Sequence, residues 1–224
     1  ETHTKYSDGL TEPAEMVKVA SESKLEAIAI TDHGPEIFVG ILPGDIDSML
    51  SEVGIIKRDA EIPVFLGVEA NIVNQNGDID ISNDVLSELD IVLGGVHDLT
   101  YSARDSGVIA ENYYESIMNA IERQEIDVLA HPFWLHEDLS PYLSQDDLKS
   151  FAKLAVETDT AIELNAKYEV PSIRVIKTCL REGVKLSFGT DAHIPEEVGN
   201  LNWQKKVMKD LGASEDNLIL ERFI

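Results

Sequence analysis

The sequence contains a single cysteine, Cys179, among its 224 residues. One thiol excludes a disulfide framework within the chain and any zinc site built from several cysteines. Basic residues are also scarce: 18 lysines and arginines stand against 42 acidic residues, which gives a formal net charge of −24. Such a charge repels phosphate backbones and disfavours a broad nucleic-acid-binding surface. A small anionic substrate is compatible with this charge only where local positive charge reverses the field.

Long apolar runs are absent as well. None approaches the ~20 residues that span a membrane, and residues 1–10 are too polar for a secretory signal peptide. Hydrophobic residues make up 43% of the chain and charged residues 27%, which is ordinary for a globular protein. The composition therefore predicts a cytoplasmic protein that folds as one domain over residues 1–224 and has no membrane partner.

Short apolar runs bounded by turn residues alternate with amphipathic segments. The runs lack strict alternation, which is typical of strands buried on both faces of a parallel sheet. We expect strands at 27–31, 64–68, 91–96, 128–130, 161–164 and 185–188. Apolar residues at helical spacing predict helices around 13–20, 46–53, 114–121, 148–155 and 173–180. Gly183 follows the last of these stripes, where a C-cap is expected.

Strand–helix units that repeat about every 30 residues predict a βαβ architecture. Six strands, with a seventh expected near or before residue 1, favour a closed or nearly closed α/β barrel. An open doubly wound sheet is the alternative. No GxGxxG or GxxxxGK[ST] motif follows any expected strand, which excludes the usual dinucleotide and P-loop sites.

Histidines and carboxylates directly follow most of the expected strands. These residues are His33, His97, His131, His193, Asp32, Glu69, Glu163 and Asp191. The C-terminal ends of all strands in a parallel barrel lie on one face, so residues distant in sequence converge there. Imidazole and carboxylate ligands without thiolate suit Zn²⁺, Mn²⁺ or Fe. Their number exceeds one tetrahedral shell, which predicts two or three ions.

The motifs, taken in order, resemble those of the polymerase-and-histidinol-phosphatase (PHP) domain family. The matching segments cover nearly the whole chain and are 2–9, 30–33, 67–69, 95–97, 131–132, 163–165 and, most specifically, Gly189-Thr-Asp-Ala-His193. The resemblance implies a distorted, TIM-like (β/α)7 barrel with a site for two or three metal ions and phosphoesterase activity.

The resemblance also implies a ligand set. The matching metal ligands are His3, Asp8, His33, Glu69, His97, His131, Asp191 and His193. The family usually opens with His-x-His, whereas this chain has Glu1 where the first histidine would stand. A carboxylate can also bind a metal, so Glu1 is a possible further ligand. The implied nucleophile is a metal-bound water held by His97, His131 and Asp191.

Other residues near the expected strand ends are candidates for supporting roles. Three would orient the ligands from behind: Asp32, Glu163 and Asn165. Three basic residues would hold the substrate phosphate: Arg104, Lys167 and Arg174. Trp134 and Tyr168 could stack on a substrate ring or pack against the barrel rim. His136 matches no ligand position and is expected on a loop near the mouth of the site.

The leading functional prediction is a metal-dependent phosphoesterase that hydrolyses a small phosphomonoester, of the histidinol-phosphate or nucleotide-phosphate kind, by metal-activated water. The ions would also supply the positive charge that this acidic chain lacks. One alternative is an amidohydrolase-type hydrolase, although no lysine directly ends an expected strand and Lys167 is only close to one. Another is a degenerate metal-binding module without turnover, which Glu1 favours and the many other ligand-type residues oppose. Cys179 is expected to be a buried structural thiol.

Overall fold

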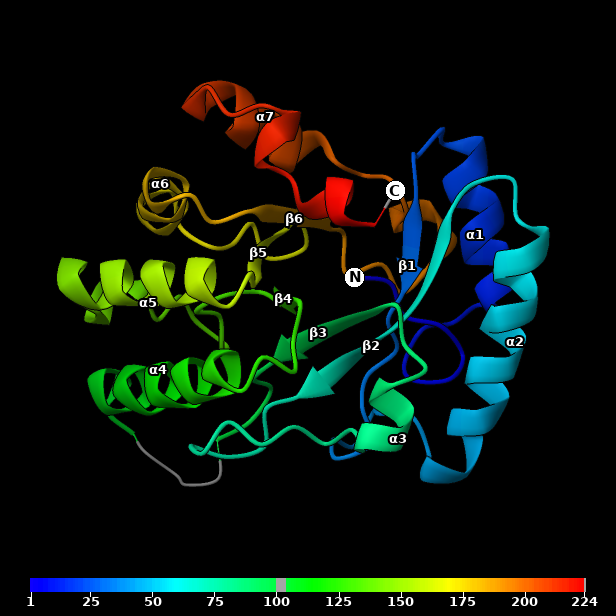
Figure 1. Cartoon of the computed structure of the whole chain (residues 1–224), viewed down its shortest axis with the longest axis horizontal. Coiled ribbons are helices and arrows are strands. Elements are labelled where there is room, and N and C mark those ends of the chain that lie inside the picture. The colour runs from blue at the N-terminus through cyan, green and yellow to red at the C-terminus, as the bar shows by residue number, and fades with distance from the viewer. Residues whose placement is uncertain (100–103, 224) are drawn as a thin grey trace.

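The computed structural model describes residues 1–99 and 104–223. Six parallel strands form one sheet in chain order, and Figure 1 shows this sheet curling into a partial barrel. The strands are β1 (Ile28–Ile30), β2 (Val64–Asn71), β3 (Ile91–Gly95), β4 (Val128–Leu129), β5 (Ala161–Asn165) and β6 (Leu186–Gly189). The α/β class and all six expected strands are thus confirmed. An open doubly wound sheet would not have its strands in chain order.

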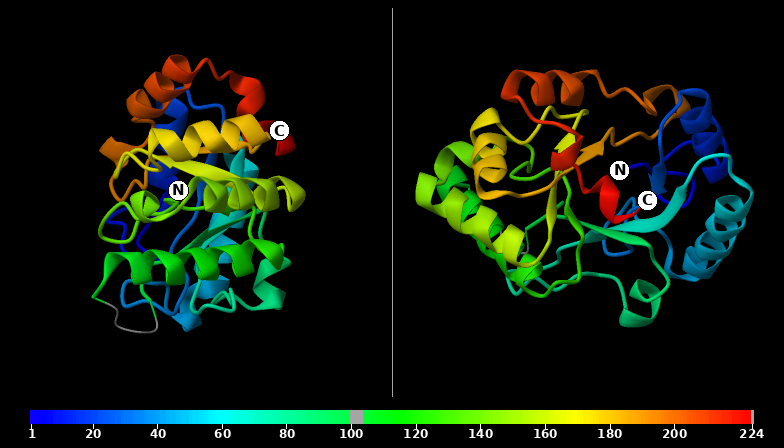
Figure 2. Two further views of the ribbon diagram at one scale, coloured as in Figure 1. Left: turned by 90° about the vertical axis from the view of Figure 1, so that its left-hand side faces the viewer. Right: turned by 45° about the horizontal axis from the view of Figure 1, so that its top comes forward.

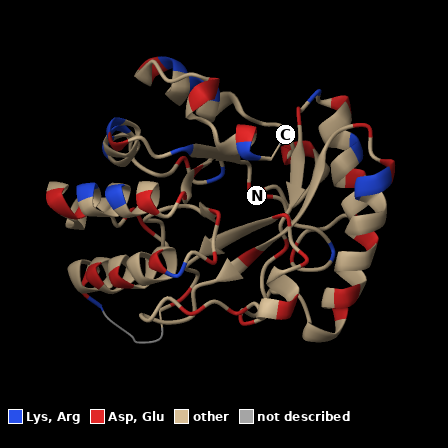
Figure 3. Cartoon of the chain, viewed as in Figure 1, with Lys and Arg blue, Asp and Glu red and all other residues tan. Residues whose placement is uncertain are grey.

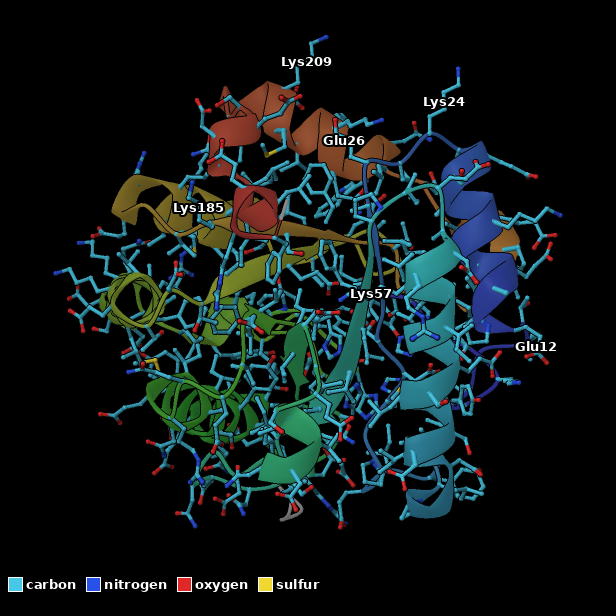
Figure 4. All side chains as sticks on the ribbon, turned by 45° about the vertical axis from the view of Figure 1, so that its right-hand side comes forward. Glu12, Lys24, Glu26, Lys57, Lys185 and Lys209 are labelled. Atoms are coloured by element: carbon cyan, nitrogen blue, oxygen red, sulfur yellow. The ribbon has the colours of Figure 1, made fainter. Side chains whose placement is uncertain are left out.

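The pairing register places the C-terminal ends of the strands along one edge. Ile28 of β1 pairs with Val64 of β2, and Gly67 of β2 pairs with Ile91 of β3. The remaining strands continue the same parallel arrangement to β6. Figure 4 marks the opposite end, where the strands begin, with Lys24, Glu26 and Lys185.

The expected seventh strand is represented by a single bridge residue within the described part of the chain. Thr2 accepts a hydrogen bond from the amide of Thr31, and the amide of His3 donates to the carbonyl of Ala192. Residues 1–3 therefore lie between the ends of β1 and β6, as Figure 1 also shows for the N-terminus. They link the two outer strands at the edge where the strands end.

Helices surround the curled sheet (Figure 2). They are α1 (Pro13–Glu22), α2 (Ile46–Asp59), α3 (Asn83–Leu86), α4 (Ser106–Glu122), α5 (Gln145–Glu157), α6 (Ile173–Glu182) and α7 (Asn202–Leu211). Short 3₁₀ turns occur at 43–45, 140–142, 195–197, 215–217 and 219–222. The five expected helices are confirmed, whereas α3 and α7 were not predicted. None of the helices within residues 1–99 and 104–223 is both long and apolar enough to cross a membrane.

Local sequence signals explain where several helices begin and end. The Asp105 carboxylate accepts hydrogen bonds from two amides in the first turn of α4. Ser144 and Asp147 form a reciprocal capping box at the start of α5. Gly183 ends α6 in the left-handed conformation with φ of 96°, so the predicted C-cap is confirmed.

The apolar core occupies both faces of the sheet. One cluster packs α4, α5 and α6 against the outer face, and a second packs α1 and α2 against β1 and β2. A third lies on the other face, where Ile91, Leu93 and Val128 contact Ile219. Cys179 is fully buried in the first cluster, and burial raises the pKa of its thiol to about 12, so the expected structural role is confirmed.

Two predicted helix stripes are slightly rotated from the buried faces. In α4, Tyr113 is fully buried, whereas its neighbour Tyr114 is only partly buried. The predicted stripe of α6 comprised Ile173, Ile176 and Leu180. Ile176 is buried as expected, but Ile173 is 43% exposed and Val175 is buried in its place. Adjacent apolar residues satisfied the spacing equally well, so the pattern alone could not choose between them.

Candidate metal centre and active site

Five histidines and four carboxylates converge at the edge where the strands end. They are His3, His33, His97, His131, His193, Glu1, Asp8, Glu69 and Asp191. Glu69 belongs to β2, whereas four others lie two or three residues beyond β1, β3, β4 and β6: His33, His97, His131 and Asp191. His193 lies four residues beyond β6. The N-terminal bridge brings residues 1–8 to the same edge. The structure thus brings together every residue that the sequence suggested as a metal ligand.

Glu69 lies at the centre of this cluster and is fully buried. Its Oε1 lies 2.8 Å from Nε2 of His131 and 3.0 Å from Nε2 of His97. Its Oε2 lies 2.9 Å from Nδ1 of His33 and 3.6 Å from Nε2 of His3. Burial raises the pKa of Glu69, but the facing imidazoles outweigh it and hold this pKa well below its usual value. Glu69 is therefore a carboxylate whose two oxygens face two different sets of imidazoles.

A second group of donors surrounds Asp8. Its Oδ1 lies 3.2 Å from Nε2 of His193, 3.7 Å from Nε2 of His33 and 4.0 Å from Nδ1 of His3. The four donor atoms lie within 4.8 Å of one another. Burial raises the pKa of Asp8, and the three histidines bring it below its usual value.

A third group comprises Glu1, His3 and Asp191. Nε2 of His3 lies 3.2 Å from a Glu1 oxygen and 3.4 Å from Oδ1 of Asp191. Burial raises the pKa of Asp191, but His3 and Lys167 hold it below its usual value. Burial and the charges of Asp191, Glu163 and Glu69 raise the pKa of Glu1 well above its usual value. Glu1 therefore lacks sufficient positive charge from the protein alone, whereas Asp191 is compensated by His3 and Lys167.

The donor atoms of this cluster fit a metal site. Within the described residues, His3 Nδ1, Asp8 Oδ1, His97 Nδ1 and Glu69 Oε2 are buried and have no hydrogen-bond partner. Several of these atoms lie within the distances given above of other potential metal-ligand atoms, but the pairs do not have hydrogen-bond geometry. Buried polar atoms in this condition are costly unless a cation compensates them. Nitrogen and oxygen donors without thiolate are those that Zn²⁺, Mn²⁺ and Fe accept.

Asp32 lies behind the Asp8 group and fixes the loop that carries it. Its carboxylate accepts hydrogen bonds from the amide and hydroxyl of Thr4, at 2.7 and 2.8 Å. It also accepts from the amide and hydroxyl of Ser7, at 3.2 and 2.6 Å. Four hydrogen bonds to one buried carboxylate leave the turn before Asp8 little freedom.

Glu163 and Asn165, at the end of β5, lie behind His131 and Glu1. Oε2 of Glu163 accepts from the amide of His131 at 2.8 Å and from Nδ2 of Asn165 at 3.1 Å. The same Asn165 amide lies 3.3 Å from Glu1 Oε2. These contacts suit the orienting role that the sequence suggested for both residues.

Gly95 and Gly189, which belong to the motifs but were given no role from the sequence, make room for these carboxylates. A Cβ atom on Gly95 would lie 2.6 Å from Oε1 of Glu69 and 3.1 Å from Nε2 of His131. A Cβ atom on Gly189 would overlap the carboxylate of Glu163. Each glycine directly ends a strand of the sheet, so its position was a signal that could have been used.

The basic residues separate into one that reaches the cluster and two that lie outside it. Nζ of Lys167 lies 3.1 Å from Oδ1 of Asp191. Burial lowers the pKa of Lys167, but Asp191 outweighs this effect and raises it, so the amine is charged. Arg174 instead donates to the carbonyls of Ser140 and Leu143. Arg104 is exposed, and neither arginine lines the cavity over the cluster.

A cavity of about 160 Å³ opens over the cluster. Trp134, His136, Lys167 and Tyr168 line it together with seven of the nine ligand candidates. A larger cavity of about 1020 Å³ lies towards the other end of the strands and is lined largely by apolar residues such as Phe65 and Ile219. The smaller cavity holds the convergent titratable groups that an active site requires.

Comparison with known proteins gives consistent matches. The family model of the PHP domain matches residues 1–167. A "Probable phosphatase" of Caldicellulosiruptor bescii is 31% identical over 222 residues, which cover 94% of this chain and 86% of the relative. Another, from Thermoanaerobacter sp. (strain X514), is 28% identical over 212 residues, which cover 90% and 80%.

A solved structure, the "putative histidinol phosphatase hisK" of Listeria monocytogenes, has a similar fold. Its TM-score is 0.76, at 16% identity, over 92% of this chain and 98% of that chain. The protein in a structure of archaeal ribonuclease P with mature tRNA gives a TM-score of 0.55 at 17% identity. Likenesses at such low identity concern the fold alone.

Proposed function

The chain belongs to the PHP domain family, and we propose that it hydrolyses a small phosphomonoester of the histidinol-phosphate or nucleotide-phosphate kind. The family and the phosphatase relatives make it a metal-dependent phosphoesterase. The observation that carries the proposal is the convergence of nine histidine and carboxylate residues, seven of which line one small cavity that also holds a charged lysine. The amidohydrolase and degenerate-module alternatives are not favoured.

We propose that the cluster holds two or three divalent ions of Zn, Mn or Fe. The Asp8 group, with His3, His33 and His193, would hold one, and Oε1 of Glu69 with His97 and His131 a second. Glu1, His3 and Asp191 would hold a third. The two oxygens of Glu69 face different imidazoles, which supports at least two sites. When bound, such ions neutralise phosphoryl oxygens and lower the pKa of water.

Lys167 is the residue that we propose to contact the substrate phosphate. Among the described residues that line the cavity, it is the only lysine or arginine. Asp191 fixes its amine at 3.1 Å, beside the cluster. A charged amine in this position would donate hydrogen bonds to a phosphoryl oxygen. Asp32, Glu163 and Asn165 would keep the ligands oriented before the substrate arrives.

The size and charge of the protein support a small substrate. A cavity of about 160 Å³ is comparable with one that holds a benzene-sized group, of about 150 Å³. Figure 3 shows acidic residues along most helices and loops. A long polyanion would meet this surface outside the cavity, at a cost that is largest at low salt. A small ester would enter only the cavity, where Lys167 and the proposed ions would supply positive charge.

We propose that residues 1–224 act as one domain in the cytoplasm. The family match ends at residue 167, but β6 pairs with β5, and Asp191 and His193 join the same cluster. The segment after residue 167 would therefore complete the site rather than form a separate unit.

The test is a substrate panel assayed with Zn²⁺, Mn²⁺ or Fe²⁺ added singly to metal-free protein. Small phosphomonoesters, phosphodiesters, single-stranded DNA and double-stranded DNA are compared at equal ester concentration. We expect the highest kcat/KM for a monoester. Faster turnover of either DNA than of every monoester would contradict the proposed substrate class.

A further inference from the structure

We propose that Asp80 is a positioning residue for the metal centre: its carboxylate ties the segment after His33 to the end of β2 and so fixes His33 beside Glu69. The inference rests on the proposed function, which it deepens by assigning a residue that lies outside every site motif of the sequence. Asp80 belongs to the loop between β2 and α3 and does not line the cavity over the cluster. Its effect on the site would therefore pass through the backbone.

The Asp80 carboxylate holds the chain at two places. Its Oδ1 accepts a hydrogen bond from the amide of Asn71 at 2.8 Å. Its Oδ2 accepts from the side-chain amide of Asn71 and, at 2.9 Å, from the backbone amide of Glu36. Asn71 ends β2 two residues after Glu69, and Glu36 lies three residues after His33. One carboxylate thus joins the loop after β1 to the end of β2.

Asn71 extends this link to Gly34, the residue that follows His33. Asn71 is 3% exposed, and its Nδ2 donates both to Asp80 and to the carbonyl of Gly34, the latter at 3.1 Å. The amide of Gly34 donates to the carbonyl of Glu69 at 2.9 Å. Both backbone polar groups of Gly34 are therefore bound to β2. A charged acceptor such as Asp80 orients the Asn71 amide more firmly than a neutral one would.

Gly34 is glycine because Asp80 lies so close to it. A Cβ atom at this position would overlap the Asp80 carboxyl group, which supplies the three nearest atoms. The backbone of Gly34 is not in the left-handed region, so close approach rather than conformation requires a glycine here. Asp80 and Gly34 thus form one tightly packed unit directly beside a proposed metal ligand.

The placement of His33 depends on this unit because its ring lies between two groups of donors. Nδ1 of His33 lies 2.9 Å from Oε2 of Glu69, and its Nε2 lies 3.7 Å from Oδ1 of Asp8. The ring also stacks on that of His3, with centroids 4.2 Å apart. Metal ligands tolerate only ~0.2 Å of displacement from their preferred distances. Release of the segment after His33 should therefore weaken metal binding before it unfolds the chain.

The experiment measures Mn²⁺ binding by metal-free protein in competition with a chelator, well below the melting temperature. Asp80→Ala removes all three acceptor contacts. Asp80→Asn keeps the size of the side chain but places an N–H donor where an acceptor is needed. We expect both variants to bind Mn²⁺ about 10- to 100-fold more weakly than the wild type, the usual effect of losing a group that orients metal ligands. A residue that only stabilised the fold would lower the melting temperature and leave this affinity unchanged.

Gly34→Ala tests the contact itself. Alone, it should also weaken Mn²⁺ binding, because the added methyl group displaces the Asp80 carboxylate. Combined with Asp80→Ala it should cause little further loss, so that the double variant stays within about 2-fold of Asp80→Ala, the range within which a second change has no separate effect. Losses that multiply in the double variant would overturn the inference, because the two residues would then act independently.

Asp84→Asn is the matched control. Asp84 is exposed at the start of α3, four residues after Asp80, and does not line the cavity, so its replacement should leave Mn²⁺ affinity unchanged. Thermal melting of each variant reports whether it is folded, and Asp80→Asn with Gly34→Ala carries the test if Asp80→Ala is not.

Wild-type Mn²⁺ affinity in the folded Asp80 variants would overturn the inference. The phosphoesterase proposal would then stand, because the binding assay uses no substrate. A wild-type protein that retains neither Mn²⁺ nor Zn²⁺ would instead contradict the metal centre of the proposed function, and the inference would fail with it.

Discussion

Replacing Asp191 by asparagine removes one negative charge from the cluster and preserves the shape of the residue. Asp191 has φ of 52°, and asparagine adopts this left-handed conformation at least as readily as aspartate. The carboxylate is 5% exposed, and its Oδ1 lies 3.1 Å from Nζ of Lys167 and 3.4 Å from Nε2 of His3. We therefore expect the fold to persist while the site loses an anionic donor.

The expected loss in kcat/KM is at least ~10²-fold, about the effect of removing one preorganised electrostatic contact. Metal content also falls, because an amide oxygen carries no charge to hold a cation. The free energy of unfolding of the metal-free protein changes by only about 1 kcal/mol, because Lys167 is 39% exposed and regains water when the pair is lost. Elemental analysis, phosphate release and thermal melting are measured on one preparation.

Asp78→Asn is the matched control. Asp78 pairs with Arg123 at 2.8 Å, is 43% exposed and lies outside the cavity, so its loss should change neither metal content nor turnover. Wild-type metal content and turnover in Asp191→Asn, with only a lower melting temperature, would refute the reasoning. Asp191 would then merely support the turn after β6.

Three further predictions concern the metal centre. Carefully dialysed protein reconstituted with Mn²⁺ or Zn²⁺ should retain two or more ions per chain by elemental analysis, and fewer than one would contradict the shared role of Glu69. Asp32→Ala removes the acceptor of four hydrogen bonds to the Asp8 loop and should weaken metal binding about 10- to 100-fold in a chelator competition; unchanged affinity would show that the loop orders itself. Metal-free protein should lose stability both when the pH falls and when the pH rises. The pKa of Glu69 in the folded protein lies well below its ordinary value of 4.5. The stability that this carboxylate contributes is therefore fully present above pH 4.5 and is lost as the pH falls towards the lowered pKa. Glu69 outweighs the lowering effect of burial and raises the pKa values of His33 and His131. The stability that these two histidines contribute is therefore fully present below pH 6.5 and is lost as the pH rises through the raised pKa values. A melting temperature that stays constant from pH 4 to 9 would count against these pairings.

Much of the fold could be predicted because parallel strands and amphipathic helices leave strong periodic signals. The strand ends alone predict that His33, Glu69, His97 and His131 lie on one edge of the sheet. Helix α7 was missed because its buried face includes Gln204, a polar residue that donates to the carbonyls of Leu164 and Gly189 and interrupts the apolar pattern.

The supporting residues were harder to predict because they depend on loop geometry. Lys167 and Arg174 both follow β5 in the sequence, but only Lys167 reaches the cluster, since Arg174 is bound to backbone carbonyls near α5. The hydroxyl of Tyr113 accepts a hydrogen bond from the amide of Phe133, and this contact also left no signal, because a buried aromatic on a helix is usually core alone. Such contacts require the spatial arrangement of two loops, which spacing along the chain does not encode.

Metal-dependent phosphoester hydrolysis is tested by phosphate release from a small phosphomonoester before and after metal removal. One preparation is assayed as metal-loaded protein, after chelation, and after the same metal is returned. We expect turnover to be lost on chelation and restored with the metal, and a reconstituted Glu69→Gln protein to stay at least ~10²-fold slower. Phosphate release that persists unchanged after complete removal of the metal would contradict this expectation.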